Sequence, residues 1–345
     1  MRGEVRRLVL QVRAAALTNY FEVARFCGLD PYRMLRGAHL APESIADPDF
    51  RIPLVPAATL IEDCARQSNC PAFGLLMVES QALSNLGPIS LLLEHEGTAR
   101  DVINAFVRYQ DLLCDSLAIG IDEGGGTAII RTELPAEAAL PQAREFLTAL
   151  VCRTMCELAN HRWHPESAHF VHAAPGDLAA HRRIFGCPLV FESDFNGLVC
   201  ASAALAAPNP QAEAVLASYA QAYVERLSFE IADRSVGGRV RRALYLLLPV
   251  GRATLDQAAA SLGLHPRALQ RLLEVEGLTF AALLNDVRRE LASRYLSGSH
   301  HNVATIAHMT GYASPSSFSR WFAAEFGRTP VAWRAQELAE NVAAA

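Results

Sequence analysis

The last hundred residues of the chain contain one unit twice, and this repeat restricts the fold more than any other feature. In each unit a short helical pattern ends at a glycine, and a second helical pattern begins at a proline, Pro266 or Pro315. Proline is favoured at the first position of a helix, and glycine just beyond the last. An arginine follows each proline at the same offset, as Arg271 and Arg320. The spacing predicts two helix–turn–helix units in tandem.

The second helix of each unit divides into a packed face and an open face. At 100° per residue, Phe318, Trp321, Phe322 and Phe326 fall on one side, and small residues with Arg320 fall on the other. Such a helix can enter the major groove of DNA, where bulky side chains would prevent entry and arginine can bind guanine. An amphipathic surface helix is the simpler interpretation of one unit alone, but two units in tandem favour DNA binding.

The distribution of charge agrees with this interpretation. The chain has a net charge of −5, which by itself argues against a polyanionic partner. Residues 238–337, however, contain 12 arginines against 7 acidic residues. A basic segment joined to an acidic body indicates that one part of the chain meets a polyanion and the other does not.

Composition excludes several other classes. No long uninterrupted apolar run predicts a membrane span, and residues 1–17 are interpreted as an amphipathic helix, not a signal peptide. The eight cysteines are scattered, so we expect reduced thiols in a cytoplasmic protein. No cofactor is predicted, because the glycines at 124–126 lack the helix and lysine of a phosphate loop.

The front part of the chain predicts an α+β domain over residues 1–205. Residues 5–80 are expected to form several short helices. The elements expected after them are a strand at 88–96, a helix at 98–117, a hairpin at 118–134, a helix at 141–162, a strand at 167–172, a short helix at 175–185 and a second hairpin at 187–205.

A linker follows at 206–237, and an all-α DNA-binding domain at 238–340. Within the linker an apolar stripe at helical spacing is expected to pack on the front domain or on a second copy. It consists of Leu216, Tyr219, Tyr223, Leu227 and Ile231. Residues 233–238 are a candidate hinge.

Two features of the front domain could indicate further chemistry. His161, His164, His169 and His172 are close in sequence. Alternation along a strand would put the last two on opposite faces, so no metal site is predicted and ordinary histidines are favoured. Cys152 and Cys156 lie one helical turn apart, and buried packing is favoured over redox sensing.

The segments 258–280 and 306–334, the second containing GYASPSSFSRWFAAEF, resemble the DNA-binding module of the AraC/XylS transcription regulators. The resemblance implies seven helices, with two recognition helices reaching successive major grooves, about 34 Å apart. Carried over by position, the candidate base contacts are Arg267, Gln270, Arg271, Pro315, Ser316, Ser319 and Arg320.

Pro315 and the two serines leave the second helix with few base-specific donors, so we expect Arg320 and phosphate contacts to dominate there. The candidate phosphate contacts are Arg288, Arg289, Arg294 and Arg334, with solvated surface arginines as the alternative.

Segments 47–77 and 181–205 resemble the arabinose-binding-type sensor domain of AraC-type regulators of ornithine use or virulence. Effectors in that subgroup are diverse, so arabinose is not inferred. The leading hypothesis is a transcription regulator, and not an enzyme, that binds double-stranded DNA and a small organic effector, forms a homodimer and contacts RNA polymerase. The alternatives are a constitutive dimeric DNA-binding protein and an enzyme fused to a DNA-binding module.

Overall fold

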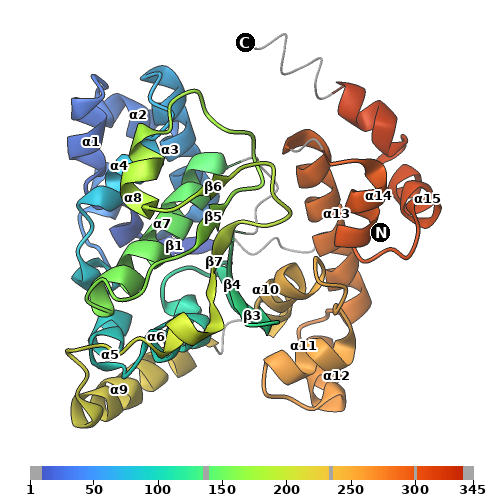
Figure 1. The fold of residues 1–345 in the computed structure, drawn as a ribbon. Helices are drawn as coiled ribbons and strands as arrows, with labels where there is room; N and C mark the ends of the chain where they lie inside the picture. Colours follow the sequence, from blue (N-terminus) through green and yellow to red (C-terminus); the bar gives the residue numbers. More distant parts are fainter. Residues whose placement is uncertain (1–9, 135–139, 233–235, 299–300, 337–345) are drawn as a thin grey trace.

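The computed structural model describes residues 10–134, 140–232, 236–298 and 301–336. Figure 1 shows two bodies side by side, an N-terminal domain of helices around a small sheet and a C-terminal domain of helices alone. The α+β and all-α expectations for the two domains are therefore confirmed. Among the described residues, no helix combines the length and the apolar character that crossing a bilayer requires.

Residues 10–80 form short helices, as expected, together with two short strands. The elements are β1 Gln11–Arg13, α1 Tyr20–Phe26, α2 Pro31–Gly37, β2 Arg51–Pro53, α3 Leu54–Gln67 and α4 Phe73–Glu79. β1 pairs antiparallel with β2. The helix expected over residues 1–17 is wrong where it can be judged, because Gln11–Arg13 is extended and Ala14–Leu17 is a single 3-10 turn; residues 1–9 lie outside the described residues.

The segment expected to be a strand at 88–96 is instead helix α5, Pro88–His95. Ile89, Leu92 and Leu93 are buried while Leu91 is 50% exposed, which is the period of a helix and not of a strand. Pro88 occupies the first helical position after Gly87, whose φ of +67° suits glycine. A Cβ at Gly87 would overlap the Arg13 guanidinium, so a side chain there would also force Arg13 to shift.

The main sheet has five strands in the order β3-β4-β7-β5-β6. Their bounds are β3 Ala118–Gly124, β4 Thr127–Glu133, β5 Ser167–His169, β6 Leu189–Val190 and β7 Gly197–Ala201. The hairpin at 118–134 is confirmed as β3 and β4. The hairpin expected at 187–205 is wrong, because β5 lies between β6 and β7 and pairs with both.

The helices expected beside the sheet are present as α6 Ala99–Tyr109, α7 Pro141–Leu158 and α8 Ala179–Phe185. Thr98 begins α6 as predicted, since its hydroxyl accepts the Asp101 N–H at 3.3 Å.

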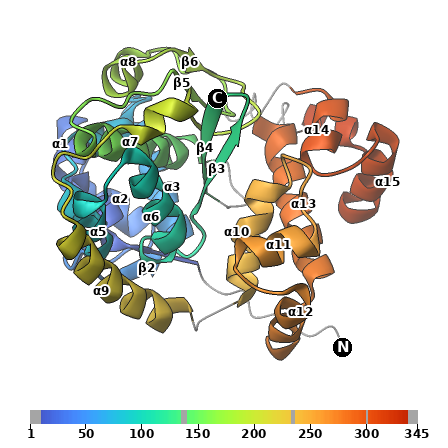
Figure 2. The ribbon, with the colours of Figure 1, turned by 60° about the horizontal axis from the view of Figure 1, so that its bottom comes forward.

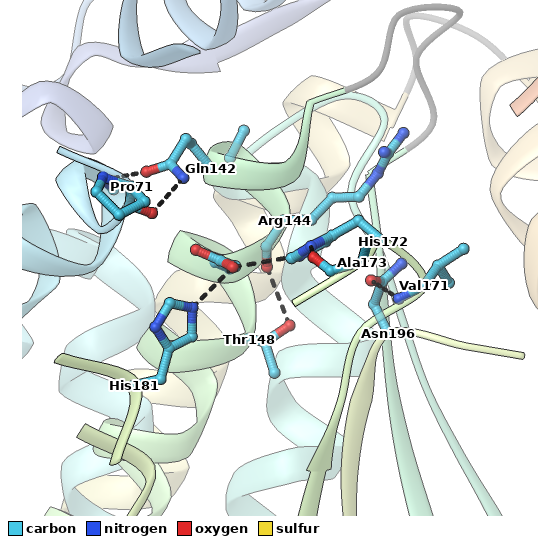
Figure 3. A network of polar contacts seen from close by, with 12 residues as sticks. Pro71, Gln142, Arg144, Thr148, Val171, His172, Ala173, His181 and Asn196 are labelled. Carbon is cyan, nitrogen blue, oxygen red and sulfur yellow. Dashed lines mark hydrogen bonds and ion pairs between the residues drawn. The ribbon is translucent and has the colours of Figure 1, made fainter. Parts of the chain in front are cut away.

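Helix α7 buries polar side chains that tie it to neighbouring segments (Figure 3). Gln142 Nε2 donates to the Pro71 carbonyl at 2.7 Å. Glu145 lies between two histidines, 2.8 Å from His181 Nε2 and 3.2 Å from His172 Nε2. These contacts fix α7 in the core, because buried polar groups cost free energy unless they are paired.

The linker is helical as expected, as α9 Ala214–Ala232, and it packs on α5 and α6 of its own domain. The packed residues are Val224, fully buried, and the half-buried Ala220 and Leu227. Three members of the expected stripe are instead largely open to solvent, Leu216 at 40%, Tyr219 at 73% and Tyr223 at 42%. The side chain of Ile231 and residues 233–235 of the candidate hinge lie outside the described residues, and residues 236–238 begin helix α10.

The C-terminal domain contains α10 Val236–Leu247, α11 Leu255–Ser261, α12 Pro266–Val275, α13 Phe280–Gly298, α14 Val303–Met309 and α15 Pro315–Phe326. Residues 330–336 are also helical. Together these make the seven helices that the sequence resemblance implied. In Figures 1 and 2, α12 and α15 occupy separate places on this domain, and the N-terminal domain faces α10 and α13.

Candidate nucleic-acid interface

The first helix–turn–helix unit forms as its local signals predict. The Thr254 hydroxyl accepts the Gln257 N–H at 3.2 Å and begins α11. Gly263, with φ +66°, makes the turn between α11 and α12. His265 is the N-cap of α12, with Nδ1 accepting the Arg267 N–H at 3.4 Å, and Pro266 takes the first helical position.

The second unit forms in the same way. Gly311, with φ +75°, makes the turn, and a Cβ there would come within 3.0 Å of Leu248. The Ser314 hydroxyl accepts the Ser317 N–H at 3.2 Å and begins α15, again with proline at the first position. The helix ends at Gly327, with φ +72°. The N-terminus of each recognition helix carries the partial positive charge of the helix dipole, which favours a nearby phosphate.

The inner faces of both helices are packed, which holds their outer faces in place. Leu269 and Leu273 of α12, and Phe318 and Phe322 of α15, are at most 1% exposed. The indole Nε1 of Trp321 donates to Asn285 Oδ1 on α13 at 2.8 Å. Phe326 stacks on Phe322 with ring centroids 4.2 Å apart. The division into faces that the sequence predicts for α15 is confirmed.

The candidate base contacts lie on the outer faces. Arg267, Gln270 and Arg271 of α12 are exposed, as are Pro315, Ser316 and Arg320 of α15, while Ser319 is half-buried. Within the described part of the chain, no hydrogen bond or ion pair holds the guanidinium groups of Arg271 and Arg320. Each is available to a partner outside the chain.

Two of the candidate phosphate contacts, on α13, already have partners within the domain. Arg288 donates from Nε to the Thr310 carbonyl at 3.1 Å and lies over the Tyr312 ring. It therefore holds α13 against the turn of the second unit. Arg289 is exposed and lies 3.5 Å from a Glu325 carboxylate oxygen. Because this ion pair is exposed and long, it leaves Arg289 able to turn toward a phosphate.

The other two are less accessible. Arg334 donates from Nε to the Leu296 carbonyl at 3.3 Å, and burial lowers its pKa from the ordinary value. Arg294 is 7% exposed and donates from Nη1 to Glu133 Oε2 of β4 at 2.9 Å. In this arrangement of the domains Arg294 cannot reach a phosphate. The expectation for Arg294 is corrected: its partner is a carboxylate of the N-terminal domain.

The four clustered histidines do not converge. His169 bonds Ser167 and Ser193, and His172 faces Glu145. His164 Nδ1 lies 3.8 Å from the Cys156 sulfur, and His164 Nε2 donates to the His161 carbonyl at 2.9 Å. Among the described residues, no three metal-binding side chains form a cluster. Cys152 is buried as expected, and Cys156 is half-buried beside it.

Sequence reasoning missed the residues that join the two domains. Besides the Arg294–Glu133 pair, Arg242 of α10 lies 2.5 Å from an Asp111 carboxylate oxygen and also donates to the Asp115 carbonyl. Ala118 of the N-terminal domain lies in the hydrophobic core of the C-terminal domain. In the sequence, Ala118 is an apolar residue that follows the acidic residues Asp111 and Asp115. This local pattern carries no information about partners more than a hundred positions away.

Two family models match the chain. The arabinose-binding N-terminal domain of AraC transcription regulators matches residues 28–209, and a helix-turn-helix domain matches residues 239–336. The transcriptional regulator VirS of Mycobacterium tuberculosis is 29% identical over 94% of this chain and 96% of its own length.

The ornithine utilization regulator of Pseudomonas aeruginosa is 25% identical over 89% of this chain and 91% of its own length. The crystal structure of the regulator CdpR from Pseudomonas aeruginosa is 20% identical, covering 91% of this chain and 97% of that one, with a TM-score of 0.42. Because the first of the two family models spans more than half of the residues, the chain belongs to the AraC family of helix-turn-helix transcription regulators.

Proposed function

We propose that α12 and α15 read two successive major grooves of one DNA duplex, with Arg271 and Arg320 as the principal base contacts. The observation that carries this proposal is the pair of N-capped helices, each with a buried inner face and an exposed, unpartnered arginine on its outer face. Arginine at such a position can bind guanine O6 and N7 together. Arg267, Gln270, Ser316 and Ser319 would supply the remaining base contacts, and Arg289 a phosphate contact.

The second part of the proposal is that a small organic effector bound in the N-terminal domain controls this reading. The domains are joined by paired charges and by shared core packing, so a change in the front domain can bias the placement of the C-terminal domain. A ligand can do so only by binding one arrangement more tightly than another. RNA polymerase is the further partner that regulation of transcription requires.

We also propose that two copies associate through α9. Its outer face exposes Val215 at 61%, Leu216 at 40%, Tyr219 at 73% and Tyr223 at 42%. The apolar residues that the sequence predicted to pack are thus left open on the surface of one copy. Tyr219→Glu should shift the chain from dimer to monomer in light scattering, whereas a wild-type chain that is monomeric at every concentration would rule the dimer out.

The DNA-binding part can be tested with the full chain and with residues 236–345. Both should retard operator DNA, and their affinity should fall steeply as salt rises, because phosphate neutralisation releases counterions. A fragment that is folded by circular dichroism but inert at low salt would contradict the proposal. A constitutive regulator without an effector is the competing function, favoured if no small molecule in a broad screen raises the melting temperature.

A further inference from the structure

The N-terminal domain contains a cavity of about 110 Å³. Its walls come from several elements, including Ala58 and Ile61 of α3, Phe106 of α6, Ile119 of β3 and Leu147 of α7. The lining is almost entirely hydrocarbon. An engineered apolar cavity of about 150 Å³ in another protein stays dry and binds benzene, so a cavity of this size and lining suits a small apolar molecule and not water.

Among the described lining residues, only Arg13, Gln81 and Asn85 have side-chain oxygen or nitrogen atoms. Arg13 is engaged, with Nη2 donating to Asp49 Oδ1 at 2.6 Å and Nη1 to the Asn85 carbonyl at 2.9 Å. Gln81 Oε1 accepts from Asn85 Nδ2 at 3.0 Å.

Gln81 Nε2 is different. Gln81 is only 8% exposed, and its side-chain Nε2 has no hydrogen-bond partner among the described residues. A buried N–H without an acceptor is unfavourable, and an acceptor atom on a ligand would remove that cost. The cavity therefore offers a hydrocarbon surface with one donor at its edge.

We propose that this cavity is the effector site, and that its ligand is a small, mainly hydrocarbon molecule with one hydrogen-bond acceptor, such as a carbonyl group, placed against Gln81 Nε2. The proposal deepens the effector control proposed above and rests on it. A pentose does not fit, because it carries a hydroxyl on nearly every carbon and the lining is almost entirely hydrocarbon. The arabinose-binding label of the domain thus describes its family and not its ligand.

The walls of the cavity are also the segments that hold the C-terminal domain. Ile119 and Leu134 line the cavity. Their sequence neighbours face the other way: Ala118 packs in the core of the C-terminal domain, and Glu133 binds Arg294. Ala118 and Ile119 are neighbours on β3, and neighbouring side chains on a strand point to opposite faces. A ligand that moves this wall therefore moves the residues on which α10 and α13 are docked.

The test uses the full chain and three probes: cyclohexanone, its isostere methylenecyclohexane, which lacks the acceptor, and L-arabinose. Saturation-transfer NMR measures binding, and the melting temperature reports stabilisation. We expect both six-membered rings to bind and raise the melting temperature, cyclohexanone about tenfold more tightly, and L-arabinose to have no effect. L-Arabinose binding in place of the rings, or no binding of either ring, would overturn the proposal.

Three variants locate the binding. Ala58→Leu should fill the cavity and abolish binding of both rings. Gln81→Met should lower the affinity for cyclohexanone about tenfold and leave that for methylenecyclohexane unchanged, whereas Gln67→Met, at the exposed end of α3, should change neither. Unchanged binding in a folded Ala58→Leu variant would place the probes elsewhere and overturn the proposal. If Ala58→Leu does not fold, the proposal is decided by comparing the affinities of cyclohexanone and methylenecyclohexane for Gln81→Met.

The outcome is separable from the proposed regulation. DNA retardation is measured on the same protein without any probe. If DNA is bound and neither ring binds, the inference about the cavity fails while DNA reading stands. If DNA is not bound, the proposed function fails whatever the probes do.

Discussion

Arg294 and Glu133 form an ion pair between the two domains, with 2.9 Å between Nη1 and Oε2 and side chains only 5% and 4% exposed. Burial, the largest single cause, would by itself lower the pKa of Arg294, but Glu133 and Tyr295 together outweigh it and raise that pKa above the ordinary value. Arg144 lies in the same region, and burial followed by the charge of Arg294 lowers its pKa to about 10. The domain interface thus contains buried charged side chains whose pKa values depend on one another.

Breaking this pair on one side should loosen the interface. Arg294→Met would leave Glu133 as a buried charge without its main partner, which costs on the order of 3 kcal/mol. The double variant Arg294→Met, Glu133→Leu should recover most of that loss, because a packed apolar pair avoids desolvation. Urea unfolding of the full chain measures both changes. A loss in the double variant as large as the sum of the two single ones would show that the residues do not interact.

The same variants distinguish the pair from a phosphate contact at Arg294. If Arg294 bound a phosphate, Arg294→Met would lose that contact. The slope of log affinity against log salt would then become shallower by about 0.9 in this variant. We expect the slope to remain that of the wild type in both Arg294→Met and Glu133→Leu. Titrations at four or five salt concentrations are sufficient to decide.

The two exposed arginines should affect sequence selectivity and not folding. Arg271→Ala and Arg320→Ala should each weaken the cognate site by about 1–3 kcal/mol and relax the preference at one base pair. Arg33→Ala, an exposed arginine on α2 of the N-terminal domain, is the matched control and should change nothing. An equal loss on cognate and random DNA would make the arginine concerned a phosphate contact instead.

The N-cap of α15 provides a prediction about stability. Ser314→Ala removes the acceptor of the Ser317 N–H and should lower the free energy of unfolding by about 1 kcal/mol. Ser316→Ala, two residues later on the exposed face, makes the same chemical change without removing a cap. It should leave stability unchanged, so any effect it has on DNA affinity reports a contact with DNA.

Glu62 predicts a pH dependence. Burial raises the pKa of its carboxyl to about 7, against the opposing hydrogen bonds from the Ala143 and Gln142 N–H groups. Because the folded state holds this proton more tightly than the unfolded state, the contribution to stability is complete below about pH 4.5 and is lost as the pH rises through 7. The size of this contribution is on the order of 3 kcal/mol.

Glu62→Gln removes this titration, so the melting temperature should fall less between pH 5 and 7.5 than in the wild type. Glu22→Gln, an exposed carboxyl on α1, is the control and should keep the wild-type profile. Parallel profiles for the wild type and Glu62→Gln would show that Glu62 does not titrate in this window.

The recognition units could be predicted because their signals are local. Ser314, Pro315 and Gly327 act within one helix, and the spacing of the aromatic residues fixes its faces. At 88–95 a short apolar run was compatible with a strand or a helix, and only the burial of Ile89 and Leu92 with exposure of Leu91 distinguishes them.

Features that depend on distant partners could not be predicted in this way. The expected hairpin at 187–205 failed because β5, from an earlier part of the chain, inserts between its two strands. The ion pair of Arg294 could not be predicted from the sequence around it, because Glu133 lies 161 positions earlier in the chain. The cavity likewise collects residues from distant segments, each of which alone is an ordinary core residue.

The length of α13 has a consequence for any operator. The helix runs for 19 residues, about 28 Å, and lies between the two units. Its Asn285 accepts the Trp321 N–H of α15, and α12 packs on α10, which itself packs on α13. If α12 and α15 each read a groove as proposed, the separation between the two sequences that one copy recognises is set by the protein. Inserting even a few base pairs between those sequences would move one of them around the duplex and out of reach, so natural sites should keep that spacing constant while the intervening bases vary.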